Sequence, residues 1–294
     1  MQPLKGKVAV VAGATRGAGR GIASMLGEVG ATVYCTGRSV RGKSTDPTRP
    51  ESIEETAEMV TAYGGVGIPV QVDHLDEAQV KALFVRVQAE QGRLDVLVND
   101  IWGGDAYTVW GKSFWEQDVQ QGLKMMRTAI ETHIITSRYG VPLLLANGSG
   151  LVIEITDGDT LDYRGNFFYD IAKTTVIRLA VAQAEELRPH GITALALTPG
   201  FLRSEAMLAH FGVTEQNWRD GAKKDPHFIA SETPYFVGRA AAALAADPNV
   251  FEKTGRAFSS WGLSDEYGFT DINGERPHWG RYFAEHVLKS PEHA

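Results

Sequence analysis

Cysteine is almost absent from this chain of 294 residues, which contains only Cys35. A single cysteine excludes an intramolecular disulfide and is typical of a protein that works in a reducing compartment, so we expect a cytoplasmic location. Cys35 lies in an apolar, strand-like run, and we interpret it as a small buried residue and not as a nucleophile.

The sequence also lacks long hydrophobic runs, a basic excess and metal-ligand motifs. No run approaches the roughly 20 apolar residues that cross a bilayer. The formal net charge is −7, whereas phosphate-binding surfaces need a clear basic excess. No H-x-E, H-E-x-x-H or cysteine cluster occurs. We therefore expect a soluble protein with no membrane, nucleic-acid or metal partner.

Short β-branched runs alternate with helix-length segments along most of the chain. Strands are predicted at residues 8–12, 31–36, 67–72, 96–99, 151–155, 193–197 and 256–259. Helices are predicted at residues 19–29, 51–63, 76–91, 168–187 and 234–246, in most of 119–145, and in a lid-like segment at 204–224. The strands are continuous apolar runs, which indicates that both faces of the sheet are covered. The pattern predicts an α/β fold with a doubly wound parallel sheet of the Rossmann type.

The domain organisation follows from the absence of a long polar linker. We predict a single domain over residues 1–260, which contains the cofactor-binding and catalytic residues. The extension at 261–294 is rich in aromatic residues and glycine. We expect it to pack on the domain or on a neighbouring subunit, and the sequence does not decide between the two.

Two glycine motifs compete for the role of a phosphate-binding loop. The segment Gly13–Gly19 reads G-x-x-x-G-x-G and lies between the first strand and the first helix. Glycines there let the backbone approach a pyrophosphate at the helix N-terminus. The segment Gly37–Ser44 matches the P-loop pattern, but Pro47 and Pro50 follow where a P-loop needs a helix. We favour the first motif and keep a nucleotidase that uses Lys43 as an alternative.

Basic residues follow the second strand, where a dinucleotide-binding fold meets the adenosine ribose. Arg38 comes after Thr36 and Gly37, with Arg41 and Lys43 nearby and no carboxylate in the stretch. An acidic residue there selects NAD, whereas arginine suits a 2′-phosphate. Arg16 in the first glycine loop is expected to reach the same phosphate. We therefore predict NADP(H) in preference to NAD(H), against the alternative of a solvated basic loop.

Tyr169 and Lys173 are four residues apart on a predicted helix, hence on one face of it. A tyrosine with its ordinary pKa near 10 is a poor base at neutral pH. An adjacent ammonium and a cationic nicotinamide both favour the phenolate and lower that pKa. We expect Tyr169 to exchange a proton with a substrate oxygen while a hydride moves to or from the cofactor.

Taken together, these features resemble the short-chain dehydrogenase/reductase family over roughly residues 5–260. The motif residues that carry the resemblance to the cofactor-binding site are Gly13, Thr15, Arg16, Gly17, Gly19, Asp73, Asn99, Pro199, Gly200 and Ser204. In the family, the residue at Asp73 contacts adenine, Asn99 begins the N-N-A-G signature, and the segment 199–204 embraces the nicotinamide. Tyr169 and Lys173 match the catalytic pair. The resemblance implies hydride transfer to or from a carbonyl or alcohol, in a homodimer or homotetramer.

Two departures from the family pattern concern the chemistry. The family has a serine at the end of the fifth strand, where this chain has Thr156 and Asp157. Thr156 lies thirteen residues before Tyr169, the usual spacing, and an ionised Asp157 would oppose phenolate formation. We favour Thr156 as the residue that orients the substrate oxygen, with Asp157 as the alternative. The family's helix asparagine is also missing. His133 is either its substitute or, as we favour, a helix-surface or interface histidine.

Five aromatic residues follow the fourth strand: Trp102, Tyr107, Trp110, Phe114 and Trp115. Open α/β sheets bind ligands outside the carboxyl ends of their strands, so these rings could line a pocket for an apolar or ring-bearing substrate. Packing within the loop is an equally good interpretation. Because of the two departures, a protein that binds NADP(H) with little catalysis, a sensor or partner subunit, stays as the alternative function.

Overall fold

The computed structural model describes residues 2–46 and 48–288. Its described part contains one sheet of seven strands in the order β3-β2-β1-β4-β5-β6-β7. All neighbouring strands are parallel. The strands are β1 (Val8–Ala12), β2 (Thr32–Gly37), β3 (Val66–Gln71), β4 (Val96–Asn99), β5 (Gly150–Ile155), β6 (Ile192–Thr198) and β7 (Ala257–Ser259). This order confirms the predicted doubly wound, Rossmann-type sheet.

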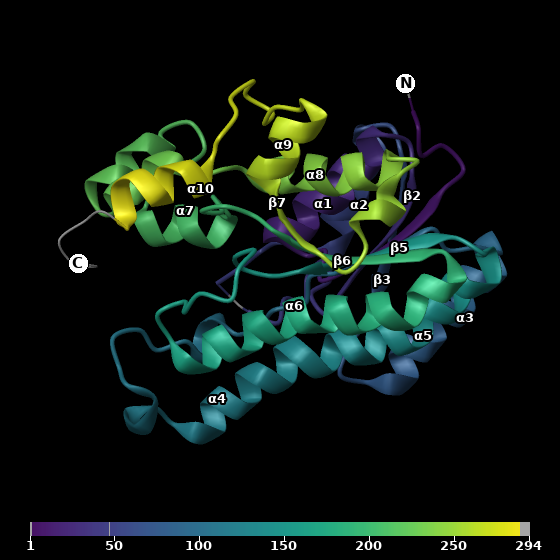
Figure 1. Cartoon of the computed structure of the whole chain (residues 1–294), viewed down its shortest axis with the longest axis horizontal. Helices are drawn as coiled ribbons and strands as arrows, with labels where there is room; N and C mark the ends of the chain where they lie inside the picture. Colours follow the sequence, from purple (N-terminus) through teal and green to yellow (C-terminus); the bar gives the residue numbers. More distant parts are fainter. Residues whose placement is uncertain (1, 47, 289–294) are drawn as a thin grey trace.

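Helices cover both faces of the sheet (Figure 1). One face carries α1 (Gly17–Glu28), α2 (Ile53–Ala62) and α8 (Pro234–Ala246), and the other carries α3 (Glu77–Gln91), α5 (Thr132–Asn147) and α6 (Phe167–Leu187). Alternate residues of β1 face the two layers, with Val11 in the cluster of α1 and α8 and Val10 in the cluster of α3, α5 and α6. Burial on both faces explains why the strands are continuous apolar runs.

Glycine permits the close packing of α1 against α8. A Cβ on Gly21 would lie 2.0 Å from the carbonyl oxygen of Pro234, and one on Gly238 would lie 2.5 Å from the carbonyl oxygen of Gly21. Within the same layer, Cys35 of β2 is fully buried, and burial raises the pKa of its thiol to about 12. This agrees with its interpretation as a packing residue.

The long helical stretch and the lid differ in detail from the prediction. A π-helical turn, Arg127–Glu131, joins α4 (Val119–Met126) to α5, and Pro142 lies inside α5. In the segment predicted as a helical lid, α7 spans only Glu205–Phe211, and a 3-10 helix follows at Trp218–Lys223. Gly212 ends α7 because it adopts a left-handed conformation with φ of 69°.

The described part of the C-terminal extension packs on the lid of its own chain. It forms α9 (Ser260–Tyr267) and α10 (Trp279–Tyr282), and Glu275 between them pairs with Arg219 of the lid at 2.7 Å. Trp279 contacts Phe201 edge to face at 5.5 Å between ring centroids, and Tyr282 lies 5.9 Å from the His227 ring. Among the residues described, no helix is long and apolar enough to span a membrane.

The topology gathers the predicted site residues at one edge of the sheet. Because the strands are parallel, the segments after β1, β2, β4, β5 and β6 all leave the sheet at this edge. The order reverses between β1 and β4, and such a switch point is where open α/β sheets bind their ligands. The glycine loop, Asp157 and the segment 199–204 therefore all lie near the start of α1 or of α6.

Candidate active site

The first glycine loop forms a close turn between β1 and α1. Gly13 and Gly17 have φ angles of 92° and 58°, which favour glycine. A Cβ on Gly13 would lie 2.2 Å from the carbonyl oxygen of Asp100, and one on Gly19 would lie 2.4 Å from the carbonyl oxygen of Gly13. The loop thus brings the first N–H groups of α1 to the sheet edge. Such a cradle fits the pyrophosphate of a dinucleotide.

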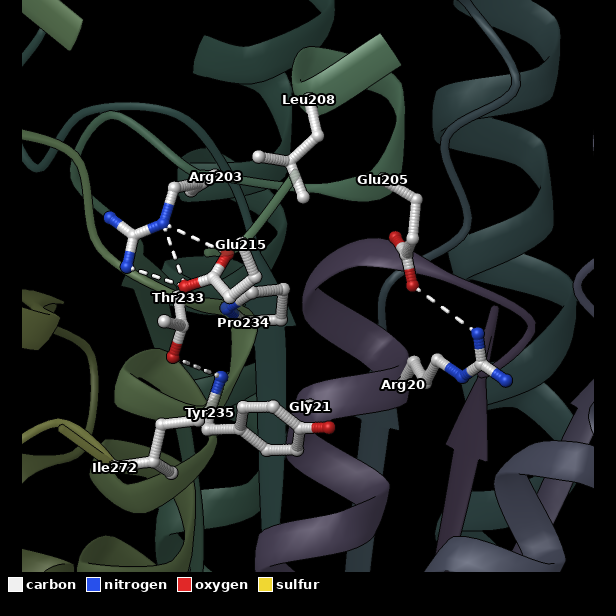
Figure 2. Close-up of a pocket in the computed structure, with 10 residues that line it drawn as sticks. All are labelled: Arg20, Gly21, Arg203, Glu205, Leu208, Glu215, Thr233, Pro234, Tyr235 and Ile272. Carbon is white, nitrogen blue, oxygen red and sulfur yellow. Dashed lines mark hydrogen bonds and ion pairs between the residues drawn. The ribbon is translucent and has the colours of Figure 1, made fainter. Parts of the chain in front are cut away.

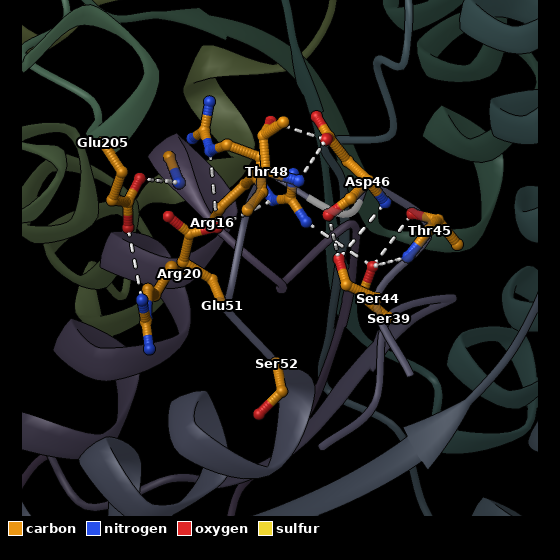
Figure 3. Close-up of polar contacts among 12 residues, drawn as sticks. Arg16, Arg20, Ser39, Ser44, Thr45, Asp46, Thr48, Glu51, Ser52 and Glu205 are labelled. Carbon is orange, nitrogen blue, oxygen red and sulfur yellow. Dashed lines mark hydrogen bonds and ion pairs between the residues drawn. The ribbon is translucent and has the colours of Figure 1, made fainter. Parts of the chain in front are cut away.

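A carboxylate of the lid binds the same helix N-terminus. The backbone N–H of Gly17 donates to Glu205 Oε2 at 2.8 Å, and Arg20 Nη1 lies 3.4 Å from Glu205 Oε1 (Figure 3). An anion is stabilised at this position because the unpaired N–H groups and the helix dipole point at it. Glu205 therefore occupies the anion position that the sequence assigned to a phosphate. An acidic residue directly after Ser204 was the only feature of the sequence that could have indicated this contact.

Space is available beside Glu205. A cavity of about 170 Å³ adjoins α1, α7 and the start of α8, and Glu205, Arg20 and Tyr235 are among its lining residues (Figure 2). Ser204, predicted to bind the cofactor, also caps α7, since its Oγ accepts the N–H of Met207 at 3.3 Å. The lid is thus anchored by a local cap, whereas Glu205 reaches across to α1.

Two arginines converge on one carboxylate near the end of β2. Arg16 Nε and Arg49 Nε lie 3.6 Å and 3.5 Å from Glu51 Oε2 (Figure 3). Arg16 Nη2 also donates to Ser39 Oγ at 3.5 Å. The sequence indicated no carboxylate here, and this is wrong because the loop before α2 brings Glu51 back to β2. Arg49 was missed for the same reason.

The other basic residues of this loop diverge. Arg38 is exposed, and its guanidinium lies toward Gly103 of the loop after β4. Arg41 binds both carboxylate oxygens of Glu58 on α2 at 2.8 Å, so it points away from the glycine loop. Helix α2 begins only at Ile53, well after Lys43. A P-loop runs directly into a helix, so the P-loop interpretation is wrong.

Asp73 and Asn99 have different surroundings. Asp73, half-buried after β3, accepts the N–H of Leu75 at 3.0 Å in the turn before α3. Asp76 caps α3. Asn99 is fully buried, and its Nδ2 donates to Ser137 Oγ and to Glu154 Oε1, both at 2.9 Å. The structure therefore corrects its assignment as a cofactor ligand, because its side chain joins β4 to β5 and α5.

Asn99 belongs to a buried polar cluster that includes His133. His133 Nδ1 lies 2.6 Å from Glu154 Oε2, and its Nε2 lies 3.1 Å from the carbonyl oxygen of Ile101. Gln183 Nε2 donates to Glu154 Oε1 at 2.8 Å. Both ring nitrogens therefore face oxygen atoms of the protein. Our expectation of a surface or interface histidine is wrong, since His133 is 1% exposed. It positions the start of the loop after β4.

The structure brings Tyr169 and Lys173 together on α6. Asn166 caps this helix by accepting the N–H of Tyr169 at 3.0 Å. The Tyr169 hydroxyl donates to Asp157 Oδ2 at 2.7 Å. Lys173 Nζ lies 5.7 Å from the centre of the Tyr169 ring and 4.0 Å from that of Trp102. The predicted pair thus has two further neighbours, Asp157 and Trp102.

Asp157, not Thr156, is the residue of the strand end that meets Tyr169. Strand β5 ends at Ile155, and the side chain of the next residue still points into the protein. Thr156 is buried, and its hydroxyl donates to the carbonyl oxygen of Lys173 at 2.7 Å. The choice of Thr156 to orient the substrate oxygen is therefore corrected. Successive side chains of an extended chain point in opposite directions, so the next residue, Asp157, reaches the edge.

The electrostatics of the pair also differ from the expectation. Burial, followed by the negative charge and hydrogen bond of Asp157, raises the pKa of Tyr169 well above its ordinary value. Burial lowers the pKa of Lys173, although Asp157 and Asp100 oppose this. The predicted lowering of the tyrosine pKa is wrong for this arrangement. Tyr169 is therefore a protonated donor.

Pro199 and Gly200 follow β6 and are supported from behind. The N–H of Gly200 donates to Glu232 Oε2 at 2.9 Å, and Ser260 Oγ donates to the same oxygen at 2.7 Å. Burial raises the pKa of Glu232 to about 8. A Cβ on Gly200 would lie 2.6 Å from the Cβ of Trp279. Glu232 and Trp279 were not predicted, because neither belongs to a motif.

The aromatic residues after β4 divide between the two interpretations. Trp102 and Trp110 lie 5.3 Å and 5.4 Å from Tyr169 between ring centroids, so they border the site. Phe114 stacks on Phe167, and Trp115 is 73% exposed. Tyr107 contacts Lys124 of α4. Only the first two rings are therefore placed to contact a substrate near Tyr169.

Comparison with known proteins places these residues in context. Residues 7–212 match the family model described as short chain dehydrogenase. The chain is 37% identical over 277 residues to dehydrogenase/reductase SDR family member 1 from Mus musculus, an alignment that covers 92% of this chain and 85% of the relative. It is 26% identical to a 7alpha-hydroxysteroid dehydrogenase from Clostridium sardiniense, covering 71% of this chain and 75% of that protein.

A solved structure shows the same fold at low identity. The crystal structure of a short chain dehydrogenase from Mycobacterium thermoresistibile superposes with a TM-score of 0.77 at 22% identity. The superposition covers 94% of this chain and 92% of that one.

Proposed function

Because the chain belongs to the short-chain dehydrogenase/reductase family, we propose that it transfers a hydride between NADP(H) and a carbonyl or alcohol substrate. The observation that carries this proposal is the position of Tyr169 and Lys173 on one face of α6, at the sheet edge where the glycine loop also lies. Membership of this family by itself identifies the chain as an oxidoreductase that uses a nicotinamide cofactor.

The proposed roles follow from the contacts. NADP(H), when bound, supplies or accepts the hydride. Tyr169 exchanges the proton with the substrate, and Lys173 holds the cofactor ribose. The residues proposed to bind the cofactor are Gly13, Thr15, Arg16, Gly17, Gly19, Arg38, Asp73, Pro199, Gly200 and Ser204. Asp157 takes the place beside the reacting group that we had assigned to Thr156.

NADP(H) in preference to NAD(H) is supported by the charges at the end of β2. Arg16 and Arg49 share Glu51, and Arg38 is exposed and has no ion pair among the described residues. Three arginines lie near two carboxylates, Glu51 and Asp46, which leaves one positive charge for a 2′-phosphate. We also propose a homodimer or homotetramer, supported by exposed apolar side chains on the long helices: Val119, Leu123 and Ile134. The buried single cysteine is compatible with the cytoplasm.

A second candidate is a cofactor-binding protein with little turnover. It is favoured by the carboxylate of Asp157, which makes Tyr169 a poor base. This candidate predicts saturable binding of nucleotide without reduction of any member of a broad carbonyl panel. One efficiently reduced compound would eliminate it.

A fluorescence titration with NADPH and, separately, with NADH tests the proposal. Trp102 lies against Lys173, so its emission is expected to change when a nucleotide enters. Saturable NADPH binding with much weaker NADH binding would support both the cofactor site and the arginine cluster. The absence of binding by either nucleotide would overturn the proposed function.

A further inference from the structure

A negative charge lies beside the proposed acid. Asp157 Oδ2 accepts the Tyr169 hydroxyl at 2.7 Å, in the position where the family has a serine. A serine hydroxyl can donate a hydrogen bond to the oxygen of a ketone, whereas a carboxylate only accepts. A ketone oxygen at the Tyr169 hydroxyl would therefore gain nothing from Asp157 and would face its lone pairs. A reacting group that carries N–H or positive charge would gain a hydrogen bond.

The nearest arginine does not neutralise Asp157. Arg164 directs its Nε to the backbone carbonyl of Asp157, not to the carboxylate. Its Nη1 donates to Asp170 Oδ1 and to Thr174 Oγ1, both at 3.1 Å, and its Nη2 donates to the carbonyl of Thr160 at 2.6 Å. The guanidinium thus joins the loop after β5 to α6 through these hydrogen bonds. Its charge is matched by Asp170.

Lys173 does not form a direct ion pair with Asp157 either. Among the described residues, no nitrogen of Lys, Arg or His lies within 4.0 Å of the Asp157 carboxylate, whereas Lys173 Nζ lies over the Trp102 ring at 4.0 Å. Two more carboxylates act on Lys173, those of Asp100 and Asp105. Burial raises the pKa of Asp100 to about 7, so it is partly charged near neutral pH. The site is therefore rich in negative charge.

Aromatic faces add to this preference for a cation. Trp102 and Trp110 both contact Tyr169, with ring centroids at 5.3 Å and 5.4 Å. The face of an indole attracts cations, and Lys173 already occupies one such position on Trp102. The half-buried Asp157 carboxylate and the two indoles thus surround the same Tyr169 side chain. These are the groups that recognise an organic cation.

We infer that the preferred acceptor at this site is a carbon–nitrogen double bond in its protonated, iminium form, held by the Asp157 carboxylate. The inference rests on the proposed hydride transfer and narrows its substrate class. The iminium carbon accepts a hydride from the reduced nicotinamide, the carbon–nitrogen π bond becomes the nitrogen lone pair, and an amine and the oxidised nicotinamide result. A neutral imine first takes the Tyr169 proton, which solvent restores. The carboxylate stabilises the cation before the hydride arrives.

A matched pair of acceptors tests the inference. Dihydroisoquinoline and tetralone have similar bicyclic shapes but offer a C=N and a C=O bond. With NADPH, kcat/KM is measured for both in the wild type and in Asp157→Ser. We expect the imine to be favoured by the wild type, and the imine-to-ketone ratio to fall about ten- to hundredfold in the variant, because a charge-assisted hydrogen bond is lost. Asp159→Ser, which removes an exposed carboxylate of the same loop, should leave the ratio unchanged.

A binding measurement separates failure of the inference from failure of the proposed function. Calorimetric titration of the NADPH-loaded protein with the cation tetrahydroisoquinoline and its neutral analogue tetralol needs no turnover, because neither compound can accept a hydride. Stronger binding of the cation, lost in Asp157→Ser and in the isosteric Asp157→Asn, supports the inference even if neither acceptor is reduced. Reduction of tetralone without the imine overturns the inference and leaves the proposed function standing. Equal binding of cation and alcohol, with no imine preference in turnover, also overturns it.

Discussion

The two halves of the ligand-binding edge are built in different ways. On the side of β1 and β2, the shape of the glycine loop is set by backbone atoms that come within 2.4 Å of a Cβ added at Gly13 or Gly19. On the side of β4, β5 and α6, the site is set by side chains, among them Asp157 and Trp102, which contact Tyr169 and Lys173. A backbone cradle requires glycine at fixed positions, so it is visible in the sequence. A side-chain arrangement depends on the direction of each residue at a strand end.

The largest expected effect separates chemistry from cofactor binding. Tyr169→Phe removes the proposed proton donor and should lower kcat by about 10²- to 10⁴-fold, the usual contribution of a general acid. Because the cradle lies on the other half of the edge, NADPH affinity should be unchanged. Steady-state kinetics and a fluorescence titration measure the two quantities. Tyr163→Phe, at a 68% exposed tyrosine, is the matched control. Equal loss in both variants would contradict the role of Tyr169.

The second largest effect is expected in the half of the edge that the glycine loop forms. Gly13→Ala places a Cβ 2.2 Å from the Asp100 carbonyl oxygen and forces alanine into a φ of 92°. The strain should lower the free energy of unfolding by about 1–3 kcal/mol and NADPH affinity by at least about tenfold. Gly148→Ala has a φ of 69° and open space, so it supplies the strain without the clash. Urea denaturation and titration compare the two variants, and indistinguishable results would refute the close approach.

A third prediction concerns cofactor choice at the end of β2. Arg16→Ala should weaken NADPH binding by about tenfold, since one charged hydrogen bond to a phosphate is removed, and should leave NADH binding unchanged. Arg41→Ala is the control, because Arg41 is bound to Glu58 on the surface of α2. The ratio of the two dissociation constants in each variant is the measurement. An equal loss of NADPH and NADH affinity would show that Arg16 supports the loop and not the 2′-phosphate.

The pH dependence of kcat/KM tests the proposed interaction between Tyr169 and Asp157. Burial, and after it the charge and hydrogen bond of Asp157, raise the pKa of Tyr169, and the protonated tyrosine is the form that donates. Reduction that takes its proton from Tyr169 is therefore active below this pKa and is lost as the pH rises through it. Removing the negative charge in Asp157→Asn lowers the pKa, so the loss should occur at lower pH than in the wild type. Oxidation, which needs the phenolate, should begin at lower pH. Profiles of kcat/KM in both directions test the sign, and coincident profiles would contradict it.

The smallest predicted effect is a gain. Glu205 accepts the Gly17 N–H at 2.8 Å, so a phosphate must displace it. Glu205→Gln removes the charge that competes for the helix N-terminus, and NADPH should bind about two- to fivefold more tightly. Asp220→Asn, at an exposed carboxylate of the lid that pairs with the exposed Lys223, is the control for a general change of charge. Weaker NADPH binding by Glu205→Gln would mean that Glu205 supports the loaded site and does not compete with it.

The sequence analysis succeeded for features that are set locally along the chain and failed for features that are set by contacts between distant side chains. Strand β4 and helix α8 have the bounds that their apolar patterns predicted. Helix geometry brings Tyr169 near Lys173 because residues four apart share a face. These predictions succeeded because they depend only on neighbours along the chain.

The errors arose where distant segments meet. Glu51 and Glu205 reach the cofactor half from a loop and from the lid, and neither stands in a motif. Thr156 was preferred to Asp157 because spacing along the chain does not reveal which of two adjacent side chains points to the edge. His133 was placed on a helix surface because its partner Glu154 is on β5. Pairings of this kind depend on the tertiary fold.

The burial of Cys35 gives the molecule a built-in reporter of its own unfolding. The thiolate is the form that reacts with alkylating reagents, and burial raises the pKa of this thiol to about 12. Because Cys35 is the one thiol in the chain and lies in the central sheet, labelling requires that β2 become exposed. The rate of alkylation in native buffer therefore measures the opening of the sheet without any engineered probe, and a bound nucleotide that stabilises the sheet should slow it.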